Sequence, residues 1–250
     1  DDLATIVAAI GQGRAVFINA RRFLTYHLTD NVAELTPFLI WALSGSRIPL
    51  ALGVLQILAL DLGTDTLSAT ALGAEPSHRA VSEGRPVSGR LLDKRVAFRS
   101  FGILGPTEAL PEMTAFFAVF LAAGWRPGQS FPESAMLAAS GAAFATVVLA
   151  QSANAFACRS TTVPVWRMPF LGNRLLIAAG LIELALAALF LLADPIAELL
   201  GHQGPPAIGW MIALGSMPLL IAVDGAHKWF ASQRSRDRGE GRRVDPEQSR

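Results

Sequence analysis

Long runs of apolar residues constrain the fold of this chain more than any other feature of its sequence. A membrane-spanning helix needs about 20 mostly apolar residues. Stretches of that kind are found at residues 23–44, 49–72, 101–124, 133–158, 172–192 and 206–223. Charged residues make up only 16% of the chain, against about 25% in a typical soluble domain. The sequence therefore predicts an all-α membrane protein with six transmembrane helices.

The basic residues are concentrated in alternate segments between these stretches, which would lie on one side of a membrane. Of the 21 Lys and Arg residues, 19 lie before the first stretch, in the links after the second and fourth, at the start of the fifth stretch, or in the C-terminal tail, whereas Arg47 and Arg126 lie in other links. Because basic residues mark cytoplasmic segments, we expect a multi-pass protein of the plasma membrane with both termini cytoplasmic. The lipid bilayer is its expected surrounding, and a net charge of +1 predicts no nucleic-acid partner.

Polar or mixed segments divide the chain further. Residues 1–22 carry apolar residues at helical spacing, interrupted by glycines, and predict an amphipathic cytoplasmic lead. Residues 73–100 are polar and contain Pro and Gly, which predicts a cytoplasmic loop. Residues 101–225 are expected to form a four-helix C-terminal transmembrane bundle. Residues 226–250 predict a basic cytoplasmic tail, disordered from residue 232.

Ionisable side chains lie near the middle of the first two stretches, which predict a transmembrane hairpin over residues 23–72. Spacings of three and four residues place them on one face of each helix, and a carboxylate at mid-membrane indicates function because it costs several kcal/mol. Oxygen ligands without Cys or His suit a hard cation or a proton rather than a soft metal. The glycine in the DLGTD run would favour an unwound turn there. The predicted cation-binding residues are Asn31, Glu34, Asp61, Thr64 and Asp65.

Other polar residues inside the stretches give a second group of candidates. The acids among them would extend the cation or proton path, or would lie near the membrane interface. The amides would complete an ion site, or would only join helices by hydrogen bonds. The whole set of buried acids has the alternative interpretation of protonated groups that hold neighbouring helices together. The candidates for an additional cation or proton path are Asp30, Glu108, Gln151, Asn154 and Glu183.

The run LTDNVAELTPFLIWALSGSRIPLALGVLQILALDLGTDTLSATALGAEP carries a more specific signal. Its segments N-x-x-E, TPFLI, I-P-L, D-L-G-T-D and A-L-G-x-E-P resemble the fifth and sixth transmembrane helices of P-type cation-transporting ATPases of the calcium-pump and sodium/potassium-pump group. Residues 1–22 resemble the end of the phosphorylation domain and the stalk of these pumps. The later stretches resemble the last four helices of the group. The resemblance implies the C-terminal transmembrane portion of such a pump.

The resemblance also implies roles for particular residues. Gln151 matches a glutamine of the group, and Glu183 matches a glutamate linked to a further ion or proton path. Asp30 replaces a small hydroxyl residue, and Asn154 stands where sodium/potassium pumps have a carboxylate, so the resemblance does not fix the selectivity. The residues that match cation-coordinating positions are Asn31, Glu34, Asp61, Thr64 and Asp65.

The parts of such a pump that handle ATP do not occur in this sequence. It contains no D-K-T-G-T, T-G-E or G-D-G-x-N-D run and no glycine-rich nucleotide cradle. Without the aspartate that accepts phosphate, the chain is not expected to hydrolyse ATP, and we expect no catalytic residue and no cofactor in it. The resemblance implies Mg-ATP and ATPase domains, upstream or in trans, as partners besides the transported cation.

Two other interpretations stay open at this point. One is a stand-alone membrane protein, degenerate or regulatory, without transport. The other is a secondary transporter or channel, although no internal repeat relates the two halves of the chain. A reading frame containing D-K-T-G-T upstream of Asp1 would favour the pump, whereas ion flux by the chain alone in liposomes would favour the transporter or channel.

Overall fold

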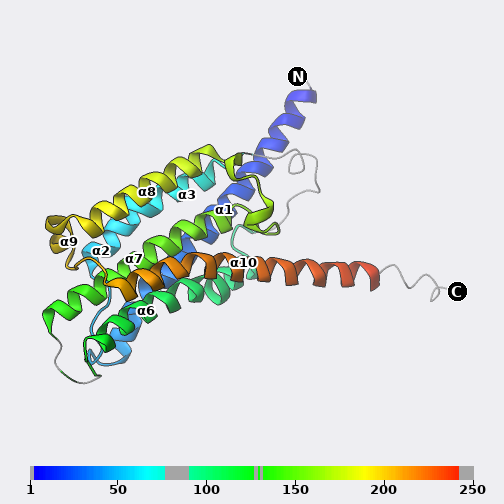
Figure 1. The fold of residues 1–250 in the computed structure, drawn as a ribbon. Helices are drawn as coiled ribbons and strands as arrows, with labels where there is room; N and C mark the ends of the chain where they lie inside the picture. The colour runs from blue at the N-terminus through cyan, green and yellow to red at the C-terminus, as the bar shows by residue number, and fades with distance from the viewer. Residues whose placement is uncertain (1–2, 77–89, 127–128, 130–131, 242–250) are drawn as a thin grey trace.

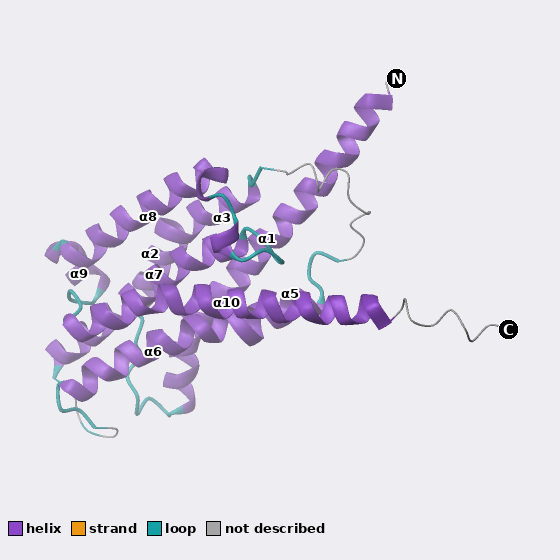
Figure 2. Cartoon of the chain, turned by 45° about the vertical axis from the view of Figure 1, so that its right-hand side comes forward, coloured by secondary structure: helices purple, strands orange, loops and turns teal. Residues whose placement is uncertain are grey.

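Helices and short loops, without a strand, make up the residues that the computed structural model describes, which are all except 1–2, 77–89, 127–128, 130–131 and 242–250. Figures 1 and 2 show the helices side by side in one bundle. In chain order the α-helices are α1 (Leu3–Leu43), α2 (Val54–Leu60), α3 (Thr66–Gly73), α5 (Lys94–Arg99), α6 (Gly105–Ala122), α7 (Glu133–Cys158), α8 (Arg174–Leu192), α9 (Asp194–Leu200) and α10 (Ala207–Gly241). The prediction of an all-α protein is confirmed.

The centre of the bundle is α7, which contacts α1, α6, α8 and α10. Most of its residues are buried on every side of the helix, and many of them are alanines. Small side chains let helix backbones approach closely in a membrane protein. At Gly209 of α10, a Cβ atom would lie only 2.7 Å from the Cβ of Ala142, so this glycine allows α10 to pack directly on α7.

The longest helix, α1, runs without a break from the predicted stalk lead into the first apolar stretch. Glycines at residues 11 and 13 weaken the helix but remove no backbone hydrogen bond, so no helix boundary lies at residue 22. The N-terminal end of α1 projects from the bundle at the same end as the C-terminal end of α10 (Figure 1). One rigid element therefore connects the projecting end with the interior.

The second apolar stretch is not one regular helix. It begins only at Val54, and a π-helical turn, η1 (Asp61–Asp65), separates α2 from α3. The backbone N–H of Thr66 donates to the carbonyl of Asp61, five residues earlier, and this bond widens the turn. An irregularity in the DLGTD run is present as expected, but it is a π-helical turn rather than an unwound segment. Single π turns occur frequently at functional sites.

Helical structure extends further than the charged sequence suggested. Within residues 73–100, α5 begins at Lys94, because the Asp93 carboxylate caps it by accepting the N–H groups of Arg95 and Val96 at 2.9 Å. A second π-helical turn, η2 (Ser100–Leu104), joins α5 to α6. The tail is helical as far as Gly241, so the expectation of disorder is wrong for residues 232–241. The rest of the tail and residues 77–89 of the loop lie outside the described residues.

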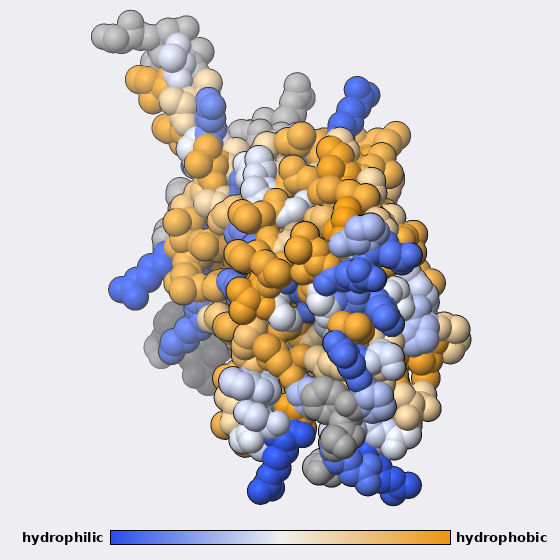
Figure 3. Space-filling model, turned by 90° about the vertical axis from the view of Figure 1, so that its left-hand side faces the viewer, coloured by the Kyte–Doolittle hydropathy of each residue, from blue (hydrophilic) through white to orange (hydrophobic). Residues whose placement is uncertain are grey.

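Within the described part of the chain, three helices are long and apolar enough to cross a membrane: α7, α8 and residues Ala207–Gln233 of α10. They coincide with the last three predicted stretches. Acids and amides lower the hydropathy of α1, glutamates and prolines lower that of α6, and η1 divides the second stretch. Large apolar side chains are exposed along α8 and α10, and hydrophobic surface covers much of the face in Figure 3. A surface of this kind is typical of contact with lipid or with further apolar helices.

Candidate cation site

Three carboxylates meet where α1 packs against the η1 turn. Glu34 of α1 and Asp61 and Asp65 of η1 each offer an oxygen, and these oxygens lie within 4.8 Å of one another. Glu34 and Asp65 are buried, and Asp61 is half-buried. Hard cations take carboxylate and carbonyl oxygens as ligands, so this arrangement can hold one. We call these three residues the primary site.

Gln151 of α7 joins the two buried carboxylates of the primary site. Its Nε2 donates to Oε1 of Glu34 at 3.1 Å and to Oδ2 of Asp65 at 3.4 Å. From α1, the hydroxyl of Tyr26 donates to the other oxygen of Asp65 at 3.3 Å. The Oε1 atom of Gln151 is buried and accepts no hydrogen bond from the described residues. The amide thus orients both acids and leaves one neutral oxygen available as a ligand.

The other two predicted ligands, Thr64 and Asn31, differ in their burial and their contacts. Thr64 is buried in η1, where its hydroxyl donates to the carbonyl of Leu60 at 2.8 Å. The side chain of Asn31 is exposed, and the structure does not bring it into the primary site. The neighbouring Asp30 is buried instead. Spacings of three and four residues from Glu34 are both compatible with one helix face, so spacing alone could not choose between the two.

His27 is a candidate ligand that the sequence did not single out. One of its ring nitrogens lies within 4.8 Å of carboxylate oxygens of Asp30 and Asp65, and these two oxygens lie equally close to each other. Its half-buried ring also packs against Phe23 of the same helix. The spacing of three residues between His27 and Asp30 was the available signal, since it places both on one side of α1.

The additional candidates are all buried, but they have different surroundings. Asn154 of α7 donates to Oδ1 of Asp30 at 3.0 Å. Glu183 of α8 accepts the backbone N–H of Ser68 at 3.0 Å, which ties α8 to α3. Glu108 of α6 has no hydrogen-bond partner among the described residues at either carboxylate oxygen. The structure therefore brings α1, η1, α6, α7 and α8 together around one acidic region.

A different kind of buried charge lies where the end of α3 meets α1 and the end of α7. The guanidinium of Arg159 binds the carboxylate of Glu75, with a shortest distance of 3.0 Å. Asn173 donates to the same carboxylate at 2.6 Å, and Asn19 of α1 donates to the backbone carbonyl of Glu75 at 2.8 Å. We call these four residues the Glu75 knot. It fastens α1 to the bundle. Glu75 and Arg159 are 84 positions apart, so the sequence held no local signal for the pair.

A second buried ionic group joins α5, α7 and α10. Arg99 donates to Asp224 at 2.7 Å, and Lys228 also binds Asp224. Both cations reach the carbonyl of Ala157, Arg99 at 3.1 Å and Lys228 at 2.9 Å. Each charge in this group therefore has an opposite charge as a direct neighbour.

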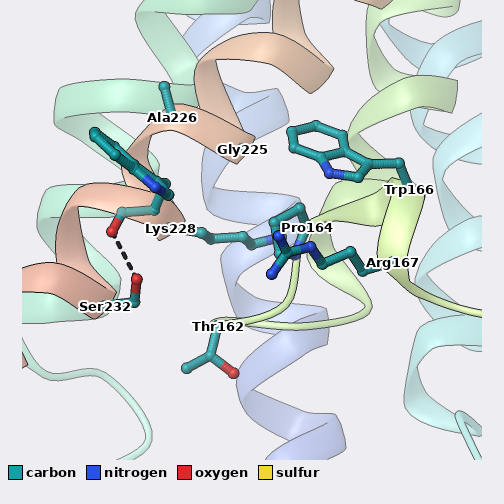
Figure 4. Close-up of a pocket in the computed structure, with 9 residues that line it drawn as sticks. Thr162, Pro164, Trp166, Arg167, Gly225, Ala226, Lys228 and Ser232 are labelled. Atoms are coloured by element: carbon teal, nitrogen blue, oxygen red, sulfur yellow. Dashed lines mark hydrogen bonds between the residues drawn. The ribbon is translucent and has the colours of Figure 1, made fainter. Parts of the chain in front are cut away.

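A surface groove of about 410 Å³ lies beside this second group, between α10 and the link from α7 to α8. Figure 4 shows Trp166 and Arg167 on one side of it and Lys228 and Ser232 on the other. None of its lining residues belongs to the primary site. The acids of the primary site therefore lie between packed helices and do not line this groove.

The amino-acid sequence of the chain is similar to those of known proteins. Residues 49–230 match the family described as "Cation transporting ATPase, C-terminus". The sodium/potassium-transporting ATPase subunit alpha-3 of Rattus norvegicus is 34% identical over 131 residues, covering 51% of this chain and 13% of the relative. The alpha-2 subunit of Gallus gallus is 27% identical over 257 residues, covering 91% of this chain and 25% of the relative. Potassium-transporting ATPase alpha chain 2 of Oryctolagus cuniculus is 34% identical over 134 residues. This chain spans a quarter or less of the length of each of these relatives.

Proposed function

This chain belongs to the cation-transporting ATPases, whose C-terminal region it matches, and on that premise we propose that it supplies the membrane path and cation site of a P-type pump. The observation that carries the proposal is the convergence of Glu34, Asp61 and Asp65 next to Gln151. The names of the similar proteins specify sodium and potassium. For this chain we propose a hard cation as the transported substrate.

The membrane arrangement follows from the same premise. We propose six spans, with α1, the segment from α2 to α3, and α6 joining the three helices that are apolar enough by themselves. In a bundle, polar helices can lie in the membrane where they face other helices, and the acids of α1 and α6 are buried in that way. Both termini would be cytoplasmic in the plasma membrane, since the ends of α1 and α10 project together.

The continuity of α1 suggests how the site is opened and closed. The same helix carries Glu34 and projects from the bundle at its N-terminal end. ATPase domains that bind Mg-ATP, upstream in the same protein or in separate chains, would act on the projecting end. A tilt of α1 would shift Glu34 relative to the η1 turn, which changes the spacing of the three carboxylates. The cation site would thereby become accessible from alternate sides of the membrane.

The test uses the full-length protein that contains this chain, reconstituted in proteoliposomes. Asp61→Asn combined with Asp65→Asn should reduce cation-stimulated ATP hydrolysis and cation uptake at least tenfold, because two of the three charged ligands are removed. Glu198→Gln, at an exposed position on α9, serves as the matched control and should change neither rate. Unchanged rates and unchanged ion dependence in the double variant would contradict the site. Ion flux without ATP would instead favour a channel or secondary transporter.

A further inference from the structure

The link between α9 and α10 lies at the end of the bundle opposite to both termini (Figure 1). It is packed directly on α7, because a Cβ atom on Gly141 would lie only 1.8 Å from the backbone oxygen of Gln203. The N–H of Gln203 also donates to the carbonyl of Leu137 of α7 at 3.0 Å. With cytoplasmic termini, this end of the bundle faces the extracellular side, and the link covers part of α7 there.

His202 of this link is buried without a polar partner for its ring. The residue is 0% exposed, and neither ring nitrogen has a hydrogen-bond partner among the described residues. One face of the ring stacks on Phe144 of α7, with the ring centres 5.1 Å apart and the planes at 23°. His202 therefore fills its place as a neutral, apolar ring.

The elements packed on this ring offer it no charge of opposite sign. They are α7, through Phe144, and α9, through the carbonyl of Ala197, which accepts the backbone N–H of His202. The acids of these two helices are exposed, and none of them bonds to the ring. Those acids are Glu133, Asp194 and Glu198, and the one other ionisable side chain is Cys158, at the far end of α7.

Protonation is therefore unfavourable while the ring is buried. Burial lowers the pKa of His202, and the nearby backbone of Gln203 offsets this only in part. A charged imidazole would gain a cation–π contact with Phe144, but that contact returns only part of the cost of burying a charge without a partner. In acid the ring is more stable in water. Gly201 and Gly204 flank the two residues of the link that would turn outward, and glycine permits such a change of backbone angles.

Contacts between aromatic rings connect His202 with the primary site. Behind His202, Phe144 packs edge to face with Phe190 of α8, with the ring centres 6.3 Å apart and the planes at 63°. The ring of Phe190 lies against Gly63, where a Cβ atom would be 3.1 Å from its Cε2 atom. Gly63 belongs to the η1 turn, which carries two of the three carboxylates of the primary site. The position of Phe190 therefore restricts the geometry of those carboxylates.

We propose that acid on the extracellular side weakens cation binding at the primary site, because protonation of His202 releases Phe144 and Phe190 from their positions. This inference rests on the proposed function for the cation and for the side of the membrane. With the link closed, the three rings hold η1 in its present geometry. With the link open, Phe144 loses the ring that covers it, Phe190 moves away from Gly63, and η1 relaxes. The two states differ in the spacing of the carboxylates, and a cation binds more tightly to one of them.

Hydrogen–deuterium exchange, with the whole chain in lipid nanodiscs, follows the link and the η1 turn separately. Protection factors at pH 7.5 and 5.5 are compared, which removes the effect of pH on the intrinsic exchange rates. In the wild type, protection of residues 201–206 should fall several-fold, up to about tenfold, since a released histidine has an ordinary pKa of about 6.5 and favours opening by about one factor of ten per pH unit below it. Protection of η1 should fall roughly threefold in parallel.

Two variants separate the steps of this mechanism. His202→Phe keeps a ring on Phe144 but takes up no proton, so neither region should respond to pH. Phe190→Leu removes the ring beside Gly63, so the link should still open in acid while η1 no longer responds. Phe230→Leu, at an exposed position on α10, is the matched control and should behave as the wild type.

The full-length protein in proteoliposomes gives the consequence for transport. ATP added to the bath reaches only molecules whose ATPase domains face outward, so the α9–α10 link of these molecules faces the lumen, where trapped buffer sets the pH. Lowering the luminal pH from 7.5 to 5.5 should raise the cation concentration for half-maximal ATP hydrolysis roughly threefold more in the wild type than in His202→Phe.

The outcomes separate this inference from the proposed function. Equal responses to luminal pH in the wild type and His202→Phe would overturn the inference, and so would protection of η1 that does not change with pH in the wild type. Cation-stimulated ATP hydrolysis in such a case would leave the proposed function intact. ATP hydrolysis that no cation stimulates would instead refute the proposed function, whereas an exchange response of η1 that requires His202 and Phe190 would still support the ring contacts as the connection.

Discussion

The Glu75 knot and the acidic region around the primary site are both buried and both polar, yet they are built on opposite rules. In the knot, Glu75 meets the guanidinium of Arg159 and the amide of Asn173. In the acidic region, carboxylates lie beside carboxylates and amides, with no salt bridge among the described residues. A charge that is paired within the protein fixes the structure, whereas one that is left unpaired can bind something from outside.

The Glu75 knot and the primary site contact α1 at different levels along the helix. The knot holds α1 through Asn19, near the end that projects from the bundle, and the primary site holds it through Glu34. A helix anchored at one level and attached through a ligand at another can transmit movement between the two levels. The comparison predicts that variants in the knot change stability, and that variants in the acidic region change cation binding.

The largest effect is expected in the knot. Arg159→Ala leaves Glu75 as a buried carboxylate without its cation, and should reduce the free energy of unfolding by about 3–5 kcal/mol. SDS titration in mixed micelles, followed by circular dichroism, measures the change. Arg167→Ala removes an exposed arginine nearby and should cost less than about 0.5 kcal/mol. A loss below about 1 kcal/mol for Arg159→Ala would show that the knot is not a structural anchor.

An intermediate effect is expected in the primary site, and only when a cation is present. A cation at 100 times its dissociation constant should stabilise the wild type by about 2.7 kcal/mol. Asp65→Asn should lose most of this gain and cost no more than about 1.5 kcal/mol in cation-free buffer, because it breaks no salt bridge and removes one hydrogen-bond acceptor. The same SDS titration, with and without cation, measures both quantities. A large loss in cation-free buffer would mean that the acidic region is structural, like the knot.

The sequence indicated most residues of the primary site but gave little sign of the Glu75 knot. Position within the apolar stretches and helical spacing were enough to indicate Glu34, Asp61 and Asp65, because both are local properties. The sequence could not show whether Asp30 or Asn31 would be buried one turn before Glu34. Asp30 is buried because it accepts a hydrogen bond from Asn154 of α7. That pairing joins residues 124 positions apart. The Glu75 knot escaped prediction for the same reason.

Helix boundaries show the same limit. The polar sequence around Asp93 predicted a loop, although Asp followed by Lys and Arg is also a helix start with an N-cap.

At the η1 turn, the sequence predicted an irregularity in the helix but not its form. The glycine in the DLGTD run indicated a weak point, but the choice between an unwound segment and a π-helical turn depends on packing. A Cβ atom on Gly63 would lie 3.1 Å from the ring of Phe190, so α8 restricts what η1 can do.

The smallest effect is expected for a third ionic contact, the half-exposed pair of Arg21 and Asp93, which joins α1 to α5 at 2.7 Å. The N–H of Val96 and then the guanidinium of Arg21 stabilise the carboxylate and lower the pKa of Asp93. Asp93→Ala should cost about 1 kcal/mol, the usual value for a lost N-cap. Asp93→Asn should cost less, because asparagine caps a helix equally well.

The pH dependence of this contact identifies its electrostatic part. A lowered folded-state pKa means that the contribution of Asp93 is fully present above the unfolded value of about 3.9 and is lost as the pH falls through the folded value. The stability difference between wild type and Asp93→Asn should therefore be constant from pH 7 to 5 and shrink in more acidic buffer. A difference that persists under acid conditions would assign the effect to packing. The contact between α1 and α5 would then differ from the Glu75 knot in kind, and not only in its exposure to water.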